Sequence, residues 1–80
     1  MMHFPKRLSY SEKFVDDTYE YRQVTVTEEV FKTLPKGRLL EEQEWRSLGI
    51  QQSQGWVHFD IFTPEPHVLL FRKRRTPLEA

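Results

Sequence analysis

The sequence predicts an α+β domain: a four-stranded antiparallel sheet with two short helices inserted between the second and third strands. Two observations indicate this fold. Segments rich in aromatic and β-branched residues occur in two pairs, and two helix signals lie between the pairs. The strands are expected at residues 8–13, 19–26, 55–62 and 67–73.

A polar turn separates the first two strands. Tyr, Phe, Val and Thr recur through residues 8–26, and the run breaks at Asp16, Asp17 and Thr18. Such residues favour turns because their side chains hydrogen-bond to nearby backbone groups.

The first helix is predicted after Thr27, a good N-cap residue. Glu28 and Glu29 would lie in its first turn, where carboxylates favour the positive end of the helix dipole. Pro35 and Gly37 end the apolar pattern.

The second helix is predicted at residues 41–48, with Trp45 on its apolar face. Glu42 and Arg46 form an i,i+4 pair. Gly49 can adopt the left-handed conformation after the last turn. Two turns of helix are not stable alone in water, so both helices must pack on the sheet.

The C-terminal strands flank the segment 63–66, where Pro64 and Pro66 exclude a central strand. In the strand before it, Val57, Phe59 and Ile61 alternate and are expected to face the core.

His58 and Asp60 would then lie together on the wetter face of that strand. A general acid–base pair needs a shielded cleft, which a chain of 80 residues rarely provides. No P-loop, dinucleotide fingerprint or nucleophile–base set is present in the sequence. We therefore expect a protein that is not an enzyme.

Length and composition predict one domain over residues 1–80, with a core at about 8–73 and a basic tail at 74–80. The chain has no cysteine, three scattered histidines, and twelve basic against twelve acidic residues. We expect no disulfide, metal or cofactor. Without a signal peptide or an apolar run of about 18 residues, we expect a soluble, intracellular protein with no membrane partner.

Residues 49–56 (GIQQSQGW) are the densest local signal. Glycines allow close approach of the backbone to a ligand, and Gln52, Ser53 and the Trp56 indole supply neutral hydrogen-bonding groups. The segment is either an anion cradle or an ordinary polar turn beside a core tryptophan. Composition alone leaves both interpretations open.

Basic residues lie at Lys13, Arg22, Arg72 and Lys73, within or at the ends of predicted strands. If they converge beside the Ser53 loop, they would complete a phosphate site. Otherwise they are solvated charges that discourage edge pairing. One sequence does not show convergence.

A nucleic-acid-binding β-domain is the alternative function, using the basic tail and the phenylalanines of the strands. The balanced net charge weighs against it, because affinity for a phosphate backbone depends on counterion release.

Five motifs together closely resemble the cyclin-dependent kinase regulatory-subunit family, over about residues 8–73. These motifs are YSEK at 10–13, YEYR at 19–22, EWRSLG at 44–49, GIQQSQGWVHF at 49–59 and PEPHVLLFR at 64–72. Their order and spacing match the family.

The resemblance implies a pocket that reads phosphothreonine followed by proline on kinase substrates or regulators. The implied pocket residues are Lys13, Arg22, Gln52, Ser53, Trp56 and Lys73. The family usually has arginine where this chain has Lys73, which keeps the charge but loses the planar fork. Either the affinity falls or Arg72 compensates, and in both cases we expect binding to persist.

The resemblance also implies docking on a cyclin-dependent kinase with its cyclin, in the nucleus and cytoplasm. The implied docking residues are Phe59, Ile61, Pro64, Glu65, His67 and Leu70. Phe59 replaces the family's usual tyrosine, and Phe62 stands where histidine is common.

The implied hinge is Pro64, Glu65 and Pro66. It either folds back, giving a monomer, or extends so that the last strand is exchanged in a homodimer. The hinge and docking residues overlap, so exchange is expected to compete with kinase docking.

Overall fold

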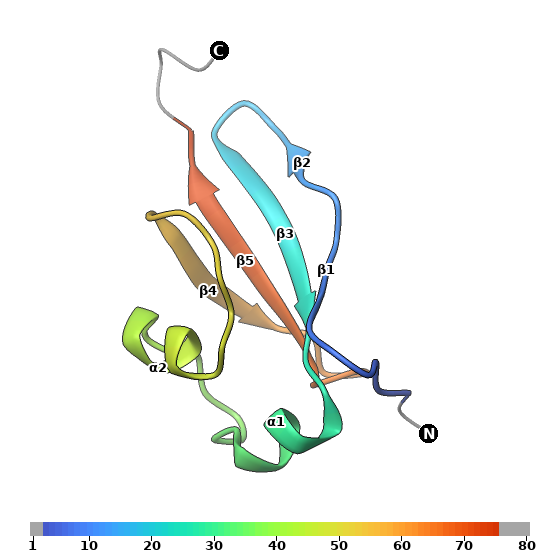
Figure 1. The fold of residues 1–80 in the computed structure, drawn as a ribbon. Helices are drawn as coiled ribbons and strands as arrows, with labels where there is room; N and C mark the ends of the chain where they lie inside the picture. The colour runs from blue at the N-terminus through green and yellow to red at the C-terminus, as the bar shows by residue number, and fades with distance from the viewer. Residues whose placement is uncertain (1–2, 76–80) are drawn as a thin grey trace.

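The computed structural model describes residues 3–75, and within them the chain forms a five-stranded antiparallel sheet (Figure 1). The sheet order is β1-β3-β5-β4, and β2 also pairs with β3. The strands are β1 (Ser9–Tyr10), β2 (Phe14–Val15), β3 (Tyr19–Thr25), β4 (Trp56–Ile61) and β5 (Val68–Arg74). The α+β class and the antiparallel sheet are as predicted.

The prediction of four strands was wrong because the expected first strand is interrupted. Tyr10 pairs with Val24 and Phe14 with Tyr21, so three residues on one strand face two on the other. The Ser11 hydroxyl accepts the backbone N–H of Gln23 at 2.9 Å, in place of a ladder carbonyl. An extra residue of this kind breaks regular pairing and leaves two short strands, β1 and β2.

The helices α1 (Glu28–Thr33) and α2 (Glu42–Ser47) therefore lie between the third and fourth strands of the structure, not the second and third. Thr27 caps α1, accepting the Val30 N–H at 3.3 Å. Gly49 follows α2 with φ of 96°, in the left-handed region. In the described part of the chain, neither helix has the length and apolar character needed to cross a bilayer.

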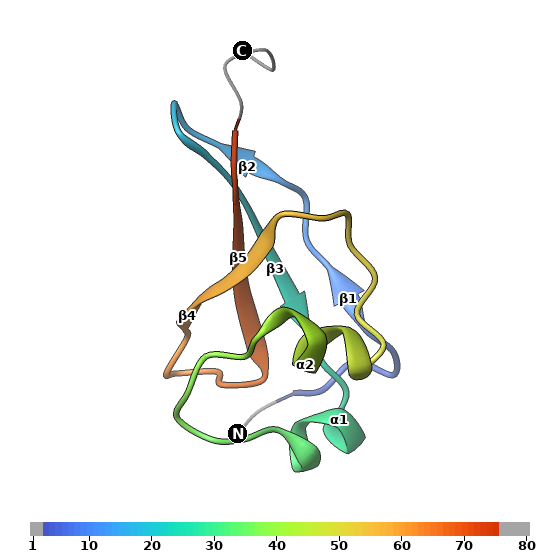
Figure 2. The same cartoon turned by 90° about the vertical axis from the view of Figure 1, so that its left-hand side faces the viewer.

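The core lies between the helices and one face of the sheet, which we call the covered face (Figure 2). Trp45 of α2 meets Phe71 of β5 edge-on, with ring centroids 5.2 Å apart, and both side chains are fully buried. The buried apolar cluster is Val24, Val26, Leu34, Leu40, Trp45, Ile50, Trp56, Leu69 and Phe71.

The faces of β4 are the reverse of the prediction at residues 56–59, up to a bulge, whereas Ile61 beyond the bulge pairs with Leu69 on the covered face, as predicted. Trp56 and His58 are buried on the covered face, whereas Val57 is 56% exposed. The register shifts between His58 and Asp60, so Phe59 is the extra residue of a bulge. Aromatic and β-branched residues fit either side of a strand, and only the position of the helices decides which side is buried.

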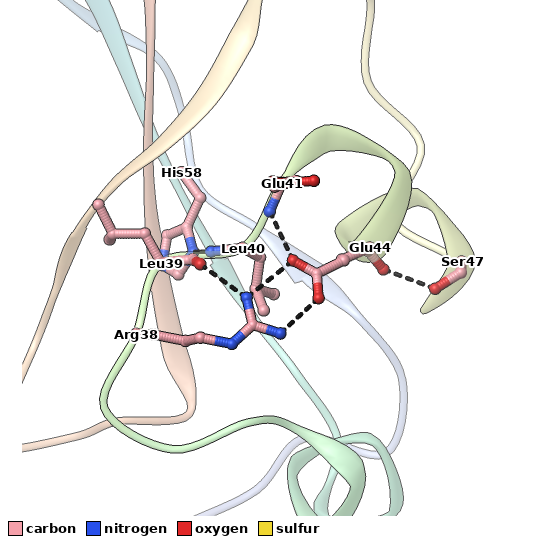
Figure 3. A network of polar contacts seen from close by, with 7 residues as sticks. All are labelled: Arg38, Leu39, Leu40, Glu41, Glu44, Ser47 and His58. Atoms are coloured by element: carbon pink, nitrogen blue, oxygen red, sulfur yellow. Dashed lines mark hydrogen bonds and ion pairs between the residues drawn. The ribbon is translucent and has the colours of Figure 1, made fainter.

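The segment between the helices is held by a polar network (Figure 3). Arg38 donates to both carboxylate oxygens of Glu44, at 3.0 and 2.5 Å. Glu44 also accepts the N–H of Glu41 at 2.8 Å, and the N–H of Leu40 donates to Nδ1 of His58 at 2.9 Å. The network therefore connects the start of α2 to β4.

We expect Glu44 to titrate far below an ordinary glutamate. The hydrogen bond from Arg38, followed by that from the Glu41 backbone, lowers the pKa of Glu44 from 4.5 to about 2. Its stabilising contribution is present above pH 4.5 and is lost as the pH falls toward 2. Carboxyl-carbon NMR titration should show the low midpoint, and Arg38→Gln should raise it. Glu42→Gln should leave the midpoint of Glu44 unchanged. If the midpoint is also unchanged in Arg38→Gln, Arg38 is not the cause of the low pKa of Glu44.

His58 should make the protein less stable in mild acid. Burial lowers the pKa of His58 below its usual 6.5, and the neutral ring accepts the Leu40 N–H through Nδ1. The unfolded chain then binds the proton more readily, so stability is retained above pH 6.5 and falls below it, by up to about 1.4 kcal/mol per pH unit. Urea unfolding at pH 7.5 and pH 5.5 measures this fall.

His58→Asn is the matched control, because its amide oxygen can accept the same N–H but does not titrate. The variant should lose less stability between the two pH values than the native chain. An equal loss in both proteins would contradict the prediction.

Candidate anion-binding site

The site begins on the covered face of the sheet, at the end remote from α1. Lys73 of β5 pairs with Glu20 of β3 on one side and with Trp56 of β4 on the other. Arg22 lies two residues along β3 from Glu20. Because side chains alternate along a strand, these four residues project to the same face. The sheet register therefore brings two cations and an indole together.

The loop from Ile50 to Gly55 adds Ser53 to this group. The Trp56 indole Nε1 donates to Ser53 Oγ at 3.2 Å, and Lys73 Nζ lies 3.5 Å from the same oxygen. Gly55 has φ of 98°, and a Cβ there would lie 3.4 Å from the Lys73 side chain. Glycine at this position permits both the turn and the passage of Lys73.

Arg22 lies beside these groups, and its Nε makes no hydrogen bond within the described residues. Its guanidinium carbon is 5.4 Å from the Trp56 ring and 5.9 Å from the Tyr10 ring. Its Nε is buried without a hydrogen-bond partner, as are both amide atoms of Gln52. Buried polar atoms are usually satisfied, so these groups point to a ligand or water as their partner.

Lys13 belongs to the same region but is more exposed. Lys13 was predicted to end the first strand, but it lies between β1 and β2. Its Nζ is 3.7 Å from Glu20, and its side chain is about half exposed, at 51%. Lys13, Glu20 and Lys73 line one shallow depression. The ion pair partly offsets the charge of Lys13, which makes it an outer member of the site.

The six predicted pocket residues are thus gathered at one end of the covered face. Within residues 3–75, neither Arg22 nor Lys73 forms an ion pair. Two cations without a carboxylate partner, a hydroxyl, an indole N–H and an amide are suited to a compact oxyanion. Among the same residues, no cluster of histidine and acidic side chains could hold a metal ion.

Two residues of the site were not predicted. The Tyr10 hydroxyl accepts the N–H of Gln51 at 2.9 Å, which ties the loop to β1. Glu20 holds Lys13. Glu20 precedes Arg22 by two positions, and residues two apart on a strand lie on the same face, so the sequence could have placed Glu20 beside Arg22. Nothing in the sequence indicated the Tyr10 contact, because it joins residues 41 positions apart.

Of the two alternatives for Lys73, compensation by Arg72 is wrong. Arg72 projects to the opposite face of the sheet, which we call the open face. Its guanidinium lies 4.2 Å from the centre of the Tyr19 ring and 5.0 Å from that of Phe59. Adjacent residues on a strand point to opposite sides, so Arg72 and Lys73 do not share a site.

The open face carries some of the predicted docking residues. Phe59 lies there against Tyr21, with ring centroids 5.8 Å apart. Leu70 projects to the same face, half-buried. Ile61 instead pairs with Leu69 on the covered side and lines an apolar pocket of about 210 Å³ beneath the hinge.

The hinge segment is folded back. Glu65 N–H donates to the Phe62 carbonyl at 3.0 Å, and Val68 N–H to the Glu65 carbonyl at 2.9 Å. Pro64 and Glu65 are exposed. His67 is 2% exposed and packs against Phe4, so its ring is not available to a partner in this conformation. The predicted docking residues therefore do not form one continuous surface.

Comparison with known proteins identifies relatives along nearly the whole chain. The family model described as cyclin-dependent kinase regulatory subunit matches residues 8–75. The chain is 57% identical over 67 residues to cyclin-dependent kinases regulatory subunit 2 of Arabidopsis thaliana, covering 84% of this chain and 81% of that protein.

Two further relatives agree. A probable cyclin-dependent kinases regulatory subunit of Physarum polycephalum is 58% identical, covering 91% of this chain and 86% of that protein. The cyclin-dependent kinases regulatory subunit of Caenorhabditis elegans is 62% identical, covering 89% and 72%. On this evidence the chain belongs to the cyclin-dependent kinase regulatory subunit family.

Proposed function

We propose that this protein is a non-catalytic adaptor that binds a cyclin-dependent kinase and reads phosphothreonine on the substrates or regulators of that kinase. The observation that carries the proposal is the convergence on Ser53. Trp56 and Lys73 both reach the Ser53 hydroxyl, and Arg22 lies against the Trp56 ring with an unpaired Nε.

The charge of the site suits a phosphate monoester. A phosphothreonine carries between −1.5 and −2 charges near neutral pH, by the usual second pKa of about 6, and offers three acceptor oxygens. Arg22 and Lys73 supply matching charge, and Lys13 adds a third, partly neutralised cation. The overall charge of the chain is zero, so this attraction is local and acts at short range.

The second partner follows from the names of the relatives, which designate regulatory subunits of cyclin-dependent kinases. We assign the kinase, in complex with cyclin, to the open face and the exposed part of the hinge. The Phe59–Tyr21 contact and the cation at Arg72 supply the aromatic and basic character that is enriched at protein interfaces.

The two proposed surfaces lie on opposite faces of one sheet, so both partners could be held at once. Tethering a phosphorylated protein to the kinase raises the effective concentration of its remaining sites and promotes multisite phosphorylation. We place this activity in cell-cycle control, in the nucleus and cytoplasm.

A phosphothreonine–proline peptide should bind, and its unphosphorylated twin should not. Arg22→Gln should weaken binding about 10- to 100-fold, since charge-assisted hydrogen bonds contribute about 1.5–3 kcal/mol. Trp56→Phe should also weaken binding, because it removes the indole N–H and keeps an aromatic ring in the core. Isothermal titration calorimetry measures both effects.

Arg38→Gln is the matched control, since it removes a guanidinium whose hydrogen bonds within the described residues go to Glu44 and Leu39 and not to the Ser53 loop. It should bind like the native chain. Normal binding by both Arg22→Gln and Trp56→Phe would show that the pocket is misassigned. Tight, salt-sensitive binding of single-stranded DNA, with no binding of the peptide, would favour the nucleic-acid alternative instead.

A strand-exchanged dimer should bind kinase more weakly than the monomer. In the folded-back form β4 pairs with β5 of its own chain, and extending the hinge would move Pro64 and Glu65 away from the docking face. The two forms can be separated by size-exclusion chromatography, and each titrated against a kinase–cyclin complex. Equal affinity of the two forms would contradict the proposed competition.

A further inference from the structure

The loop that carries Ser53 is held by an arginine outside the anion site. Arg46, at the end of α2, donates from Nη1 to the carbonyl of Gln52 at 2.9 Å and from Nη2 to the carbonyl of Ser53 at 3.3 Å. The planar guanidinium thus bridges two consecutive peptide groups. A lysine has no such fork and cannot reproduce the pair of bonds.

The rest of Arg46 is also fixed. Its Nε donates to Glu42 one turn earlier at 2.7 Å, and its guanidinium lies 4.4 Å from the centre of the Trp45 ring. Trp45 is 1% exposed and belongs to the core. Each guanidinium nitrogen therefore has an acceptor, and the flat group rests on a buried ring. These contacts fix the orientation of the guanidinium and use three of its five N–H groups.

The position of Ser53 depends on this support. The loop lies outside the strands, and its other end is tied by the bond from Gln51 N–H to the Tyr10 hydroxyl. Ser53 Oγ must stay within reach of both Trp56 Nε1 and Lys73 Nζ. A shift of the Ser53 backbone by about 1 Å would open these contacts, which lie near the outer limit of hydrogen bonding.

We propose that Arg46 is a positioning residue for the anion site. It sets the backbone of Gln52 and Ser53 from α2, so that the serine hydroxyl is preorganised for an oxyanion before the ligand arrives. This inference rests on the proposed phosphate-reading function. Preorganisation raises affinity because the cost of ordering the loop is met on folding and not on binding.

Arg46→Lys tests the proposal, because it keeps the charge and removes the fork. The affinity for the phosphothreonine–proline peptide should fall about 5- to 30-fold, corresponding to the loss of one or two hydrogen bonds. Backbone amide hydrogen exchange at Gln51, the loop residue whose N–H is bonded to Tyr10, should become faster without ligand. Inorganic phosphate serves as a second probe, and its affinity for the variant should also fall.

Two variants separate positioning from general stability. Arg38→Lys removes the fork of the other helix-anchoring arginine, which binds Glu44, and should leave both readouts unchanged. Glu42→Gln alters the Nε contact but keeps both carbonyl bonds, and should retain affinity within about twofold.

The outcomes are distinguishable. Unchanged affinity or unchanged amide exchange in Arg46→Lys would overturn the inference, as would equal weakening by Arg38→Lys. If the native chain binds neither peptide nor phosphate, the proposed function fails. Faster exchange at Gln51 in Arg46→Lys would then still support the structural part of the inference, and unchanged exchange would overturn that part as well.

Discussion

The register between β3 and β5 is the constraint on which the rest of the structure depends. Seven residues of each strand pair in succession, from Tyr19 with Arg74 to Thr25 with Val68. Because side chains alternate between faces, a slip of one residue would move every side chain of one strand to the other side. The same register that buries Phe71 therefore also places Lys73 beside Glu20 and Trp56.

This constraint couples stability to the proposed function. Trp56 packs in the core and also donates to Ser53, and Arg22 is the direct cross-strand partner of the buried Phe71, which contacts His58. The anion site is thus the polar end of the hydrophobic core and not a cleft between domains. A protein of this size has little material for a separate cavity, so the core itself supplies the rigid support for the site.

The open face is built differently from the covered face. Its aromatic rings and Arg72 contact one another across strands, and no helix within residues 3–75 covers them. Opposite faces of one sheet can carry unrelated surfaces, since each is built from alternate residues of the same strands. For this reason Arg72 and Lys73, adjacent in the chain, belong to different surfaces.

The sequence by itself determined those features that depend on local interactions. The cap at Thr27, the end of α2 at Gly49 and the pairing of the two C-terminal strands follow from interactions within a few residues. The family motifs predicted which residues form the candidate pocket. The break between β1 and β2 was hidden, because it depends on Ser11 replacing a ladder carbonyl opposite Gln23.

Only the tertiary structure decided which face of β4 is buried, because its residues fit either side until the helices cover one of them. It also decided that His67 is enclosed by Phe4 and that Arg46 reaches the Ser53 loop. These contacts join segments that are distant in sequence or that have no regular structure. Periodicity carries no signal for such contacts, and their geometry is set by packing alone.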